Sequence, residues 1–206
     1  MFTGIVTAIG TIDRVEDRSD LRIVVACPFD PAKIAIGASI ACSGVCLTVV
    51  ERGGEPGAAW FAADVSAETV SRTARGMWHA GRRLNLETSL KVGDELGGHI
   101  VTGHVDAVGT LADWQPEGAS TKLTITAPPM LAKFIASKGS IAIDGVSLTV
   151  NEVEDRADGS VCFWVNLIPH TSEVTTLGET AQGSDVNLEI DTVARYLQRL
   201  ESLRER

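Results

Sequence analysis

Residues 41–51, ACSGVCLTVVE, and residues 142–152, AIDGVSLTVNE, are identical at seven of eleven positions. A second pair repeats in the same order, because residues 2–11, FTGIVTAIGT, match residues 101–110, VTGHVDAVGT, at six of ten positions. A third pair, residues 81–87, GRRLNLE, and residues 183–189, GSDVNLE, is identical at four of seven positions. The offset between copies drifts from 99 to 101 to 102, as small loop insertions would cause. The chain is therefore two tandem copies of one domain of about a hundred residues.

Each copy has the pattern of a β domain. Residues 21–25, LRIVV, and residues 122–126, KLTIT, are short runs rich in β-branched residues, which is typical of strands. Ser43-Gly44 and Asp144-Gly145 stand at matched places between apolar runs, where tight hairpin turns are expected. Several short strands with glycine-rich turns predict a small closed barrel or a sandwich in each copy.

Few helices are expected. Short ones are predicted from Asp30 to Ile36 and, at the matched place, from Pro129 to Ser137. After a plausible N-cap at Asp191, the tail TVARYLQRLESLRER has apolar residues at every third or fourth position. Such a helix can fold back on its own barrel or associate with another chain, and its periodicity leaves both interpretations open. The apolar stripe is Val193, Tyr196, Leu197, Leu200 and Leu203.

Composition excludes several classes of protein. The 206 residues are 44% hydrophobic and 22% charged, as in ordinary globular domains that bury their own core. A net charge of −9 and only ten aromatic residues argue against a nucleic-acid partner. The chain has no apolar run long enough for a membrane span and no basic segment at its first residues, so we expect neither membrane insertion nor a secretory signal, and a cytoplasmic location.

Metal binding is not expected. None of the four cysteines forms a C-x-x-C pair, and with four histidines a zinc site would need scattered ligands. We expect reduced thiols that pack as small hydrophobic side chains.

The two copies differ at several positions where one of them has a side chain able to react or to bind a ligand. Cys46 corresponds to Ser147, Ile5 to His104 and Glu68 to His170. Specialisation of two related ligand pockets and simple sequence drift both explain such changes. His104 has a side chain able to act as an acid or base near neutral pH, or to serve as an ordinary interface histidine. Cys46 is a nucleophile only if a positive group stabilises its thiolate.

Together these motifs resemble the α-type riboflavin synthase family. The stretches that carry the resemblance are MFTGIV, the GVCLTV and GVSLTV pair, GGHIVTGHVD and IPHTSEVTTLG, and it covers essentially the whole chain. It implies an all-β fold of tandem six-stranded Greek-key barrels with a C-terminal α-helix. The implied domains are residues 1–97 and 98–190 for the two lumazine-binding barrels and 191–206 for an oligomerisation helix.

The resemblance also implies an activity. The enzyme is a transferase that dismutates two molecules of 6,7-dimethyl-8-ribityllumazine to riboflavin and 5-amino-6-(D-ribitylamino)uracil, the last step of riboflavin biosynthesis. No metal or redox cofactor is used, and the enzyme is a homotrimer with each site between the N-barrel of one chain and the C-barrel of its neighbour. Two related but diverged pockets would hold one lumazine as donor and the other as acceptor.

Site residues follow by carrying the family's positions onto this chain. The N-barrel pocket is expected to use Gly4, Ile5, Val6, Cys46, Leu47, Thr48, Asp64, Val65, Ser66, Ala67, Glu68 and Thr69. The C-barrel pocket is expected to use Gly103, His104, Val105, Lys138, Ser147, Leu148, Thr149, Asn166, Leu167, Ile168, Pro169, His170 and Thr171. Positions tied to catalysis are Phe2, Cys46, His104, Asp144 and Ser147.

One position departs from the family and two other functions compete. His170 stands where many relatives have Glu, which affects the polar contact at that end of the C-barrel pocket. A non-catalytic lumazine or flavin binder with the same barrels is one alternative, and an oligonucleotide-binding barrel is another. Both copies keep the Gly-Val-x-Leu-Thr-Val core and His104 is present, which favours the enzyme.

Overall fold

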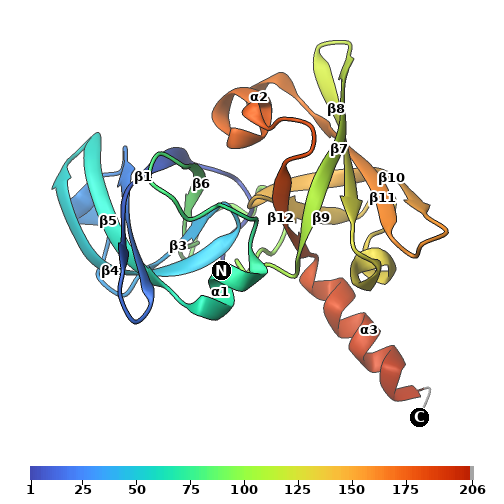
Figure 1. Cartoon of the computed structure of the whole chain (residues 1–206), viewed down its shortest axis with the longest axis horizontal. Helices are drawn as coiled ribbons and strands as arrows, with labels where there is room; N and C mark the ends of the chain where they lie inside the picture. Colours follow the sequence, from blue (N-terminus) through green and yellow to red (C-terminus); the bar gives the residue numbers. More distant parts are fainter. Residues whose placement is uncertain (205–206) are drawn as a thin grey trace.

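The repeated core stretches form strands whose residues alternate between the inside and the outside of a barrel. In the first copy Val45, Leu47 and Val49 are buried, whereas Thr48 is exposed and Cys46 is half-buried. This period of two is the spacing at which successive β side chains change face. The computed structural model describes residues 1–204 and shows two closed antiparallel barrels side by side, with a helix projecting from the second (Figure 1).

Both barrels have six strands in the same order, so the predicted fold is confirmed. The first barrel runs β1-β2-β5-β4-β3-β6, and the second has the equivalent order β7-β8-β11-β10-β9-β12. The first-barrel strands are β1 (Ala8–Asp17), β2 (Leu21–Cys27), β3 (Ser39–Cys42), β4 (Val45–Glu55), β5 (Ala58–Val65) and β6 (Arg83–Thr88). The second-barrel strands are β7 (Ala107–Glu117), β8 (Ser120–Ala127), β9 (Ser140–Ile143), β10 (Val146–Asp155), β11 (Val161–Leu167) and β12 (Asp185–Ile190).

The predicted hairpin turns are present. Cys42 pairs with Val45 across the turn, so Ser43 and Gly44 alone connect β3 to β4, with φ of 44° and 83°. Positive φ at both central residues is the turn geometry that matches the right-handed twist of the strands. The turn at Asp144-Gly145 has the same form, and an added Cβ on Gly44 would lie 2.9 Å from the backbone nitrogen of Gly145. The two turns therefore face each other between the barrels.

Three apolar clusters hold the molecule together. Each barrel has its own core, with Phe61 the largest fully buried side chain in the first and Phe163 in the second. A smaller cluster of Phe2, Ala41, Val101 and Ala142 lies between the barrels. Since burial of apolar area is the main favourable contribution to folding, the first two clusters stabilise each barrel and the third joins them.

The short helices differ from the expected ones. Residues 31–33 and 129–134 form short 3₁₀ helices, η1 (Pro31–Lys33) and η2 (Pro129–Phe134). Both end earlier than predicted, because Ile34 and Ile135 return to extended backbone toward β3 and β9. Two α-helices were not predicted, α1 (Ala67–Arg72) after β5 and α2 (Pro169–Val174) after β11. A 3₁₀ turn, η3 (Thr176–Glu179), follows α2.

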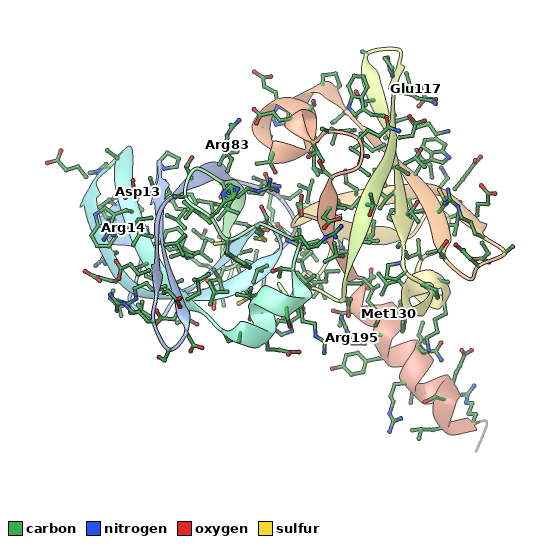
Figure 2. The ribbon with its side chains drawn as sticks, viewed as in Figure 1. Asp13, Arg14, Arg83, Glu117, Met130 and Arg195 are labelled. Carbon is green, nitrogen blue, oxygen red and sulfur yellow. The ribbon has the colours of Figure 1, made fainter. Side chains whose placement is uncertain are left out.

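The C-terminal helix α3 (Thr192–Arg204) is present as predicted and points away from both barrels (Figure 1). The Asp191 side chain accepts a hydrogen bond from the backbone N–H of Val193 at 2.8 Å, which satisfies a free donor of the first turn. The Arg195 guanidinium donates to both carboxylate oxygens of Asp106 at 2.7 and 2.9 Å, and Figure 2 shows Arg195 at the base of the helix, near Met130. Within residues 1–204 no helix has the length and apolar character needed to cross a membrane.

Candidate active site

The beginning of each repeat crosses from one barrel to the other. We define residues 2–6 as the first crossing segment and residues 101–105 as the second. They meet at Phe2 and Val101, where each backbone N–H donates to the other residue's carbonyl at 2.7 and 3.0 Å. Phe2 and Val101 are matched positions of the two copies, and their isolated bridge holds the two segments side by side.

A buried glutamate anchors each crossing segment. Glu87 Oε1 accepts from the backbone N–H and the hydroxyl of Thr3, both at 2.7 Å, and Oε2 accepts from the N–H of Gly4 at 2.9 Å. Glu189 accepts equivalent bonds from Thr102 and Gly103 and one more from the N–H of His104 at 3.1 Å. Burial raises the pKa of Glu87, and the hydrogen bonds from Thr3 and Gly4 oppose that rise. The glutamates were not predicted, although each ends a repeated Asn-Leu-Glu motif.

Beyond its glutamate, each segment reaches the other repeat's barrel. Gly103 accepts a backbone hydrogen bond from Cys46 at 2.8 Å, and Gly4 accepts one from Ser147 at 2.8 Å. Val105 packs against the first core, whereas Val6 packs against the second. Gly103 has a φ of +79°, and an added Cβ would lie 2.6 Å from that of Cys46, so only glycine fits there.

The predicted division of residues between pockets is therefore wrong for the crossing segments. Gly4, Ile5 and Val6 were assigned to the N-barrel pocket but lie on the second barrel, and Gly103, His104 and Val105 show the reverse. The physical reason is the exchange at Phe2 and Val101, which places each segment against the opposite copy of the Gly-Val-x-Leu-Thr-Val strand. Comparing the sequences of the two copies cannot reveal such an exchange. Each copy has the same sequence pattern whether its first segment packs on its own barrel or on the other one.

The first-barrel site is a surface pocket of about 190 Å³. Its lining residues are Val45, Cys46, Glu68, Thr69, Arg72, Thr73, Gly103, His104 and Val105. Helix α1 positions Glu68 and Thr69 because Ser66 caps its first turn, accepting from the N–H of Thr69 at 3.2 Å. Arg72 pairs with Glu68 at 2.8 Å one turn along the helix. The pocket thus combines a thiol, an imidazole and an exposed ion pair.

We define the second-barrel site by the residues that correspond in the repeat to those of the first-barrel site, which are Ser147, the first crossing segment and the first turn of α2. Ser147 is half-buried on β10, Ile5 is exposed on the crossing segment next to Gly4, and His170 is exposed in the first turn of α2 after Pro169. Pro at this first position starts the helix as Ser66 starts α1. This site presents a hydroxyl where the first-barrel site presents a thiol.

His99 is part of the second-barrel site and was not predicted. Its Nδ1 lies 2.7 Å from the Ser147 hydroxyl oxygen, and only 8% of the residue is exposed. Burial lowers the pKa of His99, while the charges of Asp191 and Glu189 act in the opposite direction. The residue belongs to the linker GGHI between the copies, so a comparison restricted to the repeats passes over it.

Other predicted pocket residues have their side chains in the barrel cores. Leu47 and Val65 belong to the first core, and Leu148 and Leu167 belong to the second. Their outward neighbours Thr48 and Thr149 are exposed on the same strands as Cys46 and Ser147. The alternation of a strand explains this result, because consecutive residues cannot face the same side.

Most of the remaining predicted residues are exposed or half-buried at the surface. Asp64 on β5 pairs with Arg22 at 2.8 Å, which lowers the pKa of Asp64. Lys138 has a left-handed backbone with a φ of 66°, where the first copy has Gly37 with 84°. Such a conformation costs a residue with a Cβ on the order of 1 kcal/mol or more. The other exposed or half-buried positions are Ala67, Asn166, Ile168 and Thr171.

Phe2 and Asp144 lie at the junction between the barrels. Phe2 is fully buried in the third cluster, and Asp144 is 4% exposed, with its carboxylate accepting from the N–H of Asn187 at 2.8 Å. Asn85 donates its side-chain amide to the carbonyl of Asp144, and Asn187 donates likewise to that of Ser43, both at 2.9 Å. Burial raises the pKa of Asp144 to about 6. These contacts give both residues a part in joining the barrels.

A larger cavity lies away from the predicted residues. It has a volume of about 360 Å³ at one end of the first barrel, and its lining includes Phe29, Ile34 and Lys91. Among residues 1–204 there is no group of three or more His, Cys, Asp or Glu side chains arranged to hold a metal, and the four cysteines are free thiols. The sites that unite the predicted polar residues are therefore the first-barrel and second-barrel sites.

Comparison with known proteins agrees with two copies of one domain. The family model described as "Lumazine binding domain" matches twice, over residues 3–89 and 102–191. Riboflavin synthase of Brucella abortus (strain 2308) is 50% identical over 206 residues, covering 97% of this chain and 98% of that protein. Riboflavin synthase of Bacillus subtilis (strain 168) is 33% identical over 201 residues, covering 97% of this chain and 89% of that protein.

Solved structures with ligands are also similar. The crystal structure of LumP complexed with riboflavin has a TM-score of 0.78 and 28% identity, covering 92% of this chain and 99% of LumP. LumP complexed with 6,7-dimethyl-8-(1'-D-ribityl) lumazine has a TM-score of 0.75 and 27% identity with the same coverage.

Proposed function

This chain belongs to the riboflavin synthase family, and we propose that it dismutates two molecules of 6,7-dimethyl-8-ribityllumazine to riboflavin and 5-amino-6-(D-ribitylamino)uracil. One molecule gives a four-carbon unit to the other, which makes the protein a transferase in the last step of riboflavin biosynthesis. Atoms and electrons balance between the two substrates and the two products, so the reaction needs no external oxidant. The observation that carries the proposal is the pair of related sites with different polar groups, within a chain 50% identical to a riboflavin synthase.

The two sites suit the two roles that the reaction requires. The methyl group on carbon 7 of the lumazine is conjugated to an electron-poor ring, so its loss of a proton gives a delocalised anion. His104 in the first-barrel site, or a water that it orients, is the proposed base. Cys46, Ser147 or a water held by one of them is the proposed group that adds to the other ring and activates it.

Most of the rate enhancement is expected from holding the two lumazines in register. Effective molarities for well-oriented reactants reach about 10⁵ M or more, so positioning contributes several kcal/mol. Backbone groups and hydroxyls around both sites, including Thr48 and Thr149, suit a polar ring edge and a ribityl chain. Loss of one side chain should therefore cost less than in a catalytic triad.

Assembly into a homotrimer completes the proposed site. The first-barrel site is open at the surface, Ser147 of the second-barrel site is half-buried, and α3 presents an apolar stripe whose five residues are 49–66% exposed. Large exposed apolar patches mark association surfaces. We place the working site between the first-barrel site of one chain and the second-barrel site of its neighbour, in the cytoplasm.

Riboflavin formation tests the proposal directly. Purified protein incubated with 6,7-dimethyl-8-ribityllumazine should produce riboflavin fluorescence faster than a matched sample without protein. The alternative function is lumazine binding without turnover, as the ligands of the LumP structures illustrate. A protein that retains a yellow chromophore through purification and forms no riboflavin would support that alternative.

A further inference from the structure

The linker between the repeats supplies the second-barrel site with a side chain that neither copy contains. His99 lies between the two family matches, which end at residue 89 and begin again at residue 102. Its backbone N–H donates to the carbonyl of Thr3 at 3.1 Å, which fixes the linker against the first crossing segment. The imidazole then reaches Ser147, with 2.7 Å between Nδ1 and the hydroxyl oxygen.

Several contacts hold the imidazole and the hydroxyl in fixed positions. Ser147 donates its backbone N–H to Gly4 at 2.8 Å, so its Cα is fixed by the same crossing segment that holds the linker. An added Cβ on Gly98 would lie 2.1 Å from the carbonyl oxygen of Thr3 and 2.9 Å from the Ser147 hydroxyl, which shows how closely the linker packs here. The His99 ring is nine-tenths buried, and its Nε2 has no hydrogen-bond partner among the described residues.

A hydroxyl with one fixed hydrogen bond has a restricted direction for its others. A serine hydroxyl otherwise rotates to suit its surroundings, with one donor and two acceptor positions. The bond to Nδ1 occupies one of these positions, and because Ser147 is half-buried rather than buried, the remaining ones are available to a ligand. Because the hydroxyl is already oriented, less conformational entropy is lost when a ligand binds to it.

We infer that His99 is a positioning residue, which fixes the Ser147 hydroxyl so that it can hydrogen-bond the lumazine in the second-barrel site. The inference rests on the proposed function for the identity of the ligand. It assigns His99 no contact with the lumazine itself. The first-barrel site has a different arrangement, because Cys46 takes the place of the serine and the imidazole of His104 is exposed in the pocket.

A mutant cycle tests this inference. Ser147→Ala and His99→Leu should each lower kcat/KM about tenfold, and the double variant should lose about tenfold rather than about hundredfold, because both changes remove the same interaction. His99→Asn, whose side-chain amide can occupy the position of Nδ1, should stay within about threefold of the unaltered protein. His99→Gln places its amide near the position of Nε2 instead, so it should be about as inactive as His99→Leu. His79→Leu changes an exposed histidine elsewhere and is the matched control, expected to keep full activity.

The outcomes separate this inference from the proposed function. Multiplicative losses in the double variant, or equal activity of the Asn and Gln variants, would overturn the role of His99. If His99→Leu fails to fold by circular dichroism, the Asn and Gln pair decides the result alone. If the unaltered protein binds 6,7-dimethyl-8-ribityllumazine but makes no riboflavin, the proposed function fails, and the same cycle is measured by fluorescence titration of that lumazine. A protein that neither binds nor converts it overturns both proposals.

Discussion

His104 and Thr48 lie near the same thiol but offer a ligand different chemistry. The His104 imidazole can accept and return a proton, whereas the Thr48 hydroxyl can only exchange hydrogen bonds. Both side chains are exposed on the outer surface of the first barrel, so replacing either leaves the apolar core intact. The two residues therefore separate proton transfer from binding.

Their substitutions should separate turnover from affinity. We expect His104→Ala to lower kcat on the order of 10²-fold with little change in lumazine affinity, because general acid–base catalysis contributes at least that much. Thr48→Val should weaken lumazine binding about fivefold, since one hydrogen bond contributes about 1 kcal/mol. Steady-state kinetics and fluorescence titration measure the two effects. Full turnover of His104→Ala between pH 6 and pH 8 would rule out its proton-transfer role.

Asp144 makes the stability of the protein depend on pH. Its pKa of about 6 in the folded state lies above the ordinary value of 3.8, because burial disfavours the charged form. The folded protein therefore binds this proton more tightly than the unfolded chain does. Its contribution to the free energy of unfolding decreases as pH rises from about 4 to about 6 and is constant above that range.

Asp144→Asn should remove this dependence. The asparagine oxygen can still accept the hydrogen bond from Asn187, and the side chain is neutral at every pH. We expect the variant to be more stable than the unaltered protein at pH 7.5 by at most about 3 kcal/mol, and nearly equal to it at pH 4. Urea unfolding at both pH values measures the difference. Glu87 is present in both proteins, so its own contribution to the pH dependence is the same in each. If the free energy of unfolding changes equally with pH in the variant and in the unaltered protein, Asp144 stays ionised in the folded state.

Among the elements, the strands could be predicted from the sequence and the crossing segments could not. Period-two patterns and the Ser43-Gly44 and Asp144-Gly145 turns are local signals, and each appears in the structure as expected. The exchange of residues 2–6 and 101–105 between barrels depends on contacts about a hundred residues apart, which no local pattern records. Candidate residues on the strands were therefore found, but their grouping into two pockets was not.

Helices α1 and α2 also could not be predicted from the sequence. Each has six residues, too few for the period of an amphipathic helix to be recognised. The remaining signals were Ser66 as N-cap and Pro169 at the first helical position. Helix α1 supplies the first-turn residues that line the pocket with Cys46, and α2 occupies the corresponding place in the second copy, so short capped turns after a strand are the feature to look for.

Substitution of Gly103 tests whether the second crossing segment packs against the first barrel. Gly103→Ala introduces a Cβ beside that of Cys46 at a φ of +79°, whereas Gly183→Ala meets open space at +85°. Both variants lose about 1–2 kcal/mol through the left-handed backbone. We expect Gly103→Ala to lose about 1–3 kcal/mol more through crowding, and at least tenfold in activity, while Gly183→Ala keeps its activity. Equal stability of the two variants, by urea unfolding, would show that the segment does not press on Cys46.

At the scale of the whole molecule, α3 is expected to couple assembly to activity. Its base contacts the second barrel through Arg195, Asp106 and η2, and its apolar stripe is exposed on the part of the helix that projects away from the barrels (Figure 1). Deleting residues 191–206 should give a lighter species in sedimentation and lower turnover. Both barrels should remain folded, because their cores end at Ile190. A truncated protein that sediments as a trimer with unchanged turnover would move the assembly contacts to the barrels.

We propose that two inequivalent sites bring two identical substrates together, one as donor and one as acceptor. The most direct test is the mass balance of the reaction, measured by chromatography after incubation with 6,7-dimethyl-8-ribityllumazine in the presence of a chelator and without an electron acceptor. We expect two lumazines to be consumed for each riboflavin and each 5-amino-6-(D-ribitylamino)uracil formed. Riboflavin without an equal amount of the pyrimidine, or turnover that stops with the chelator and returns with zinc, would contradict it.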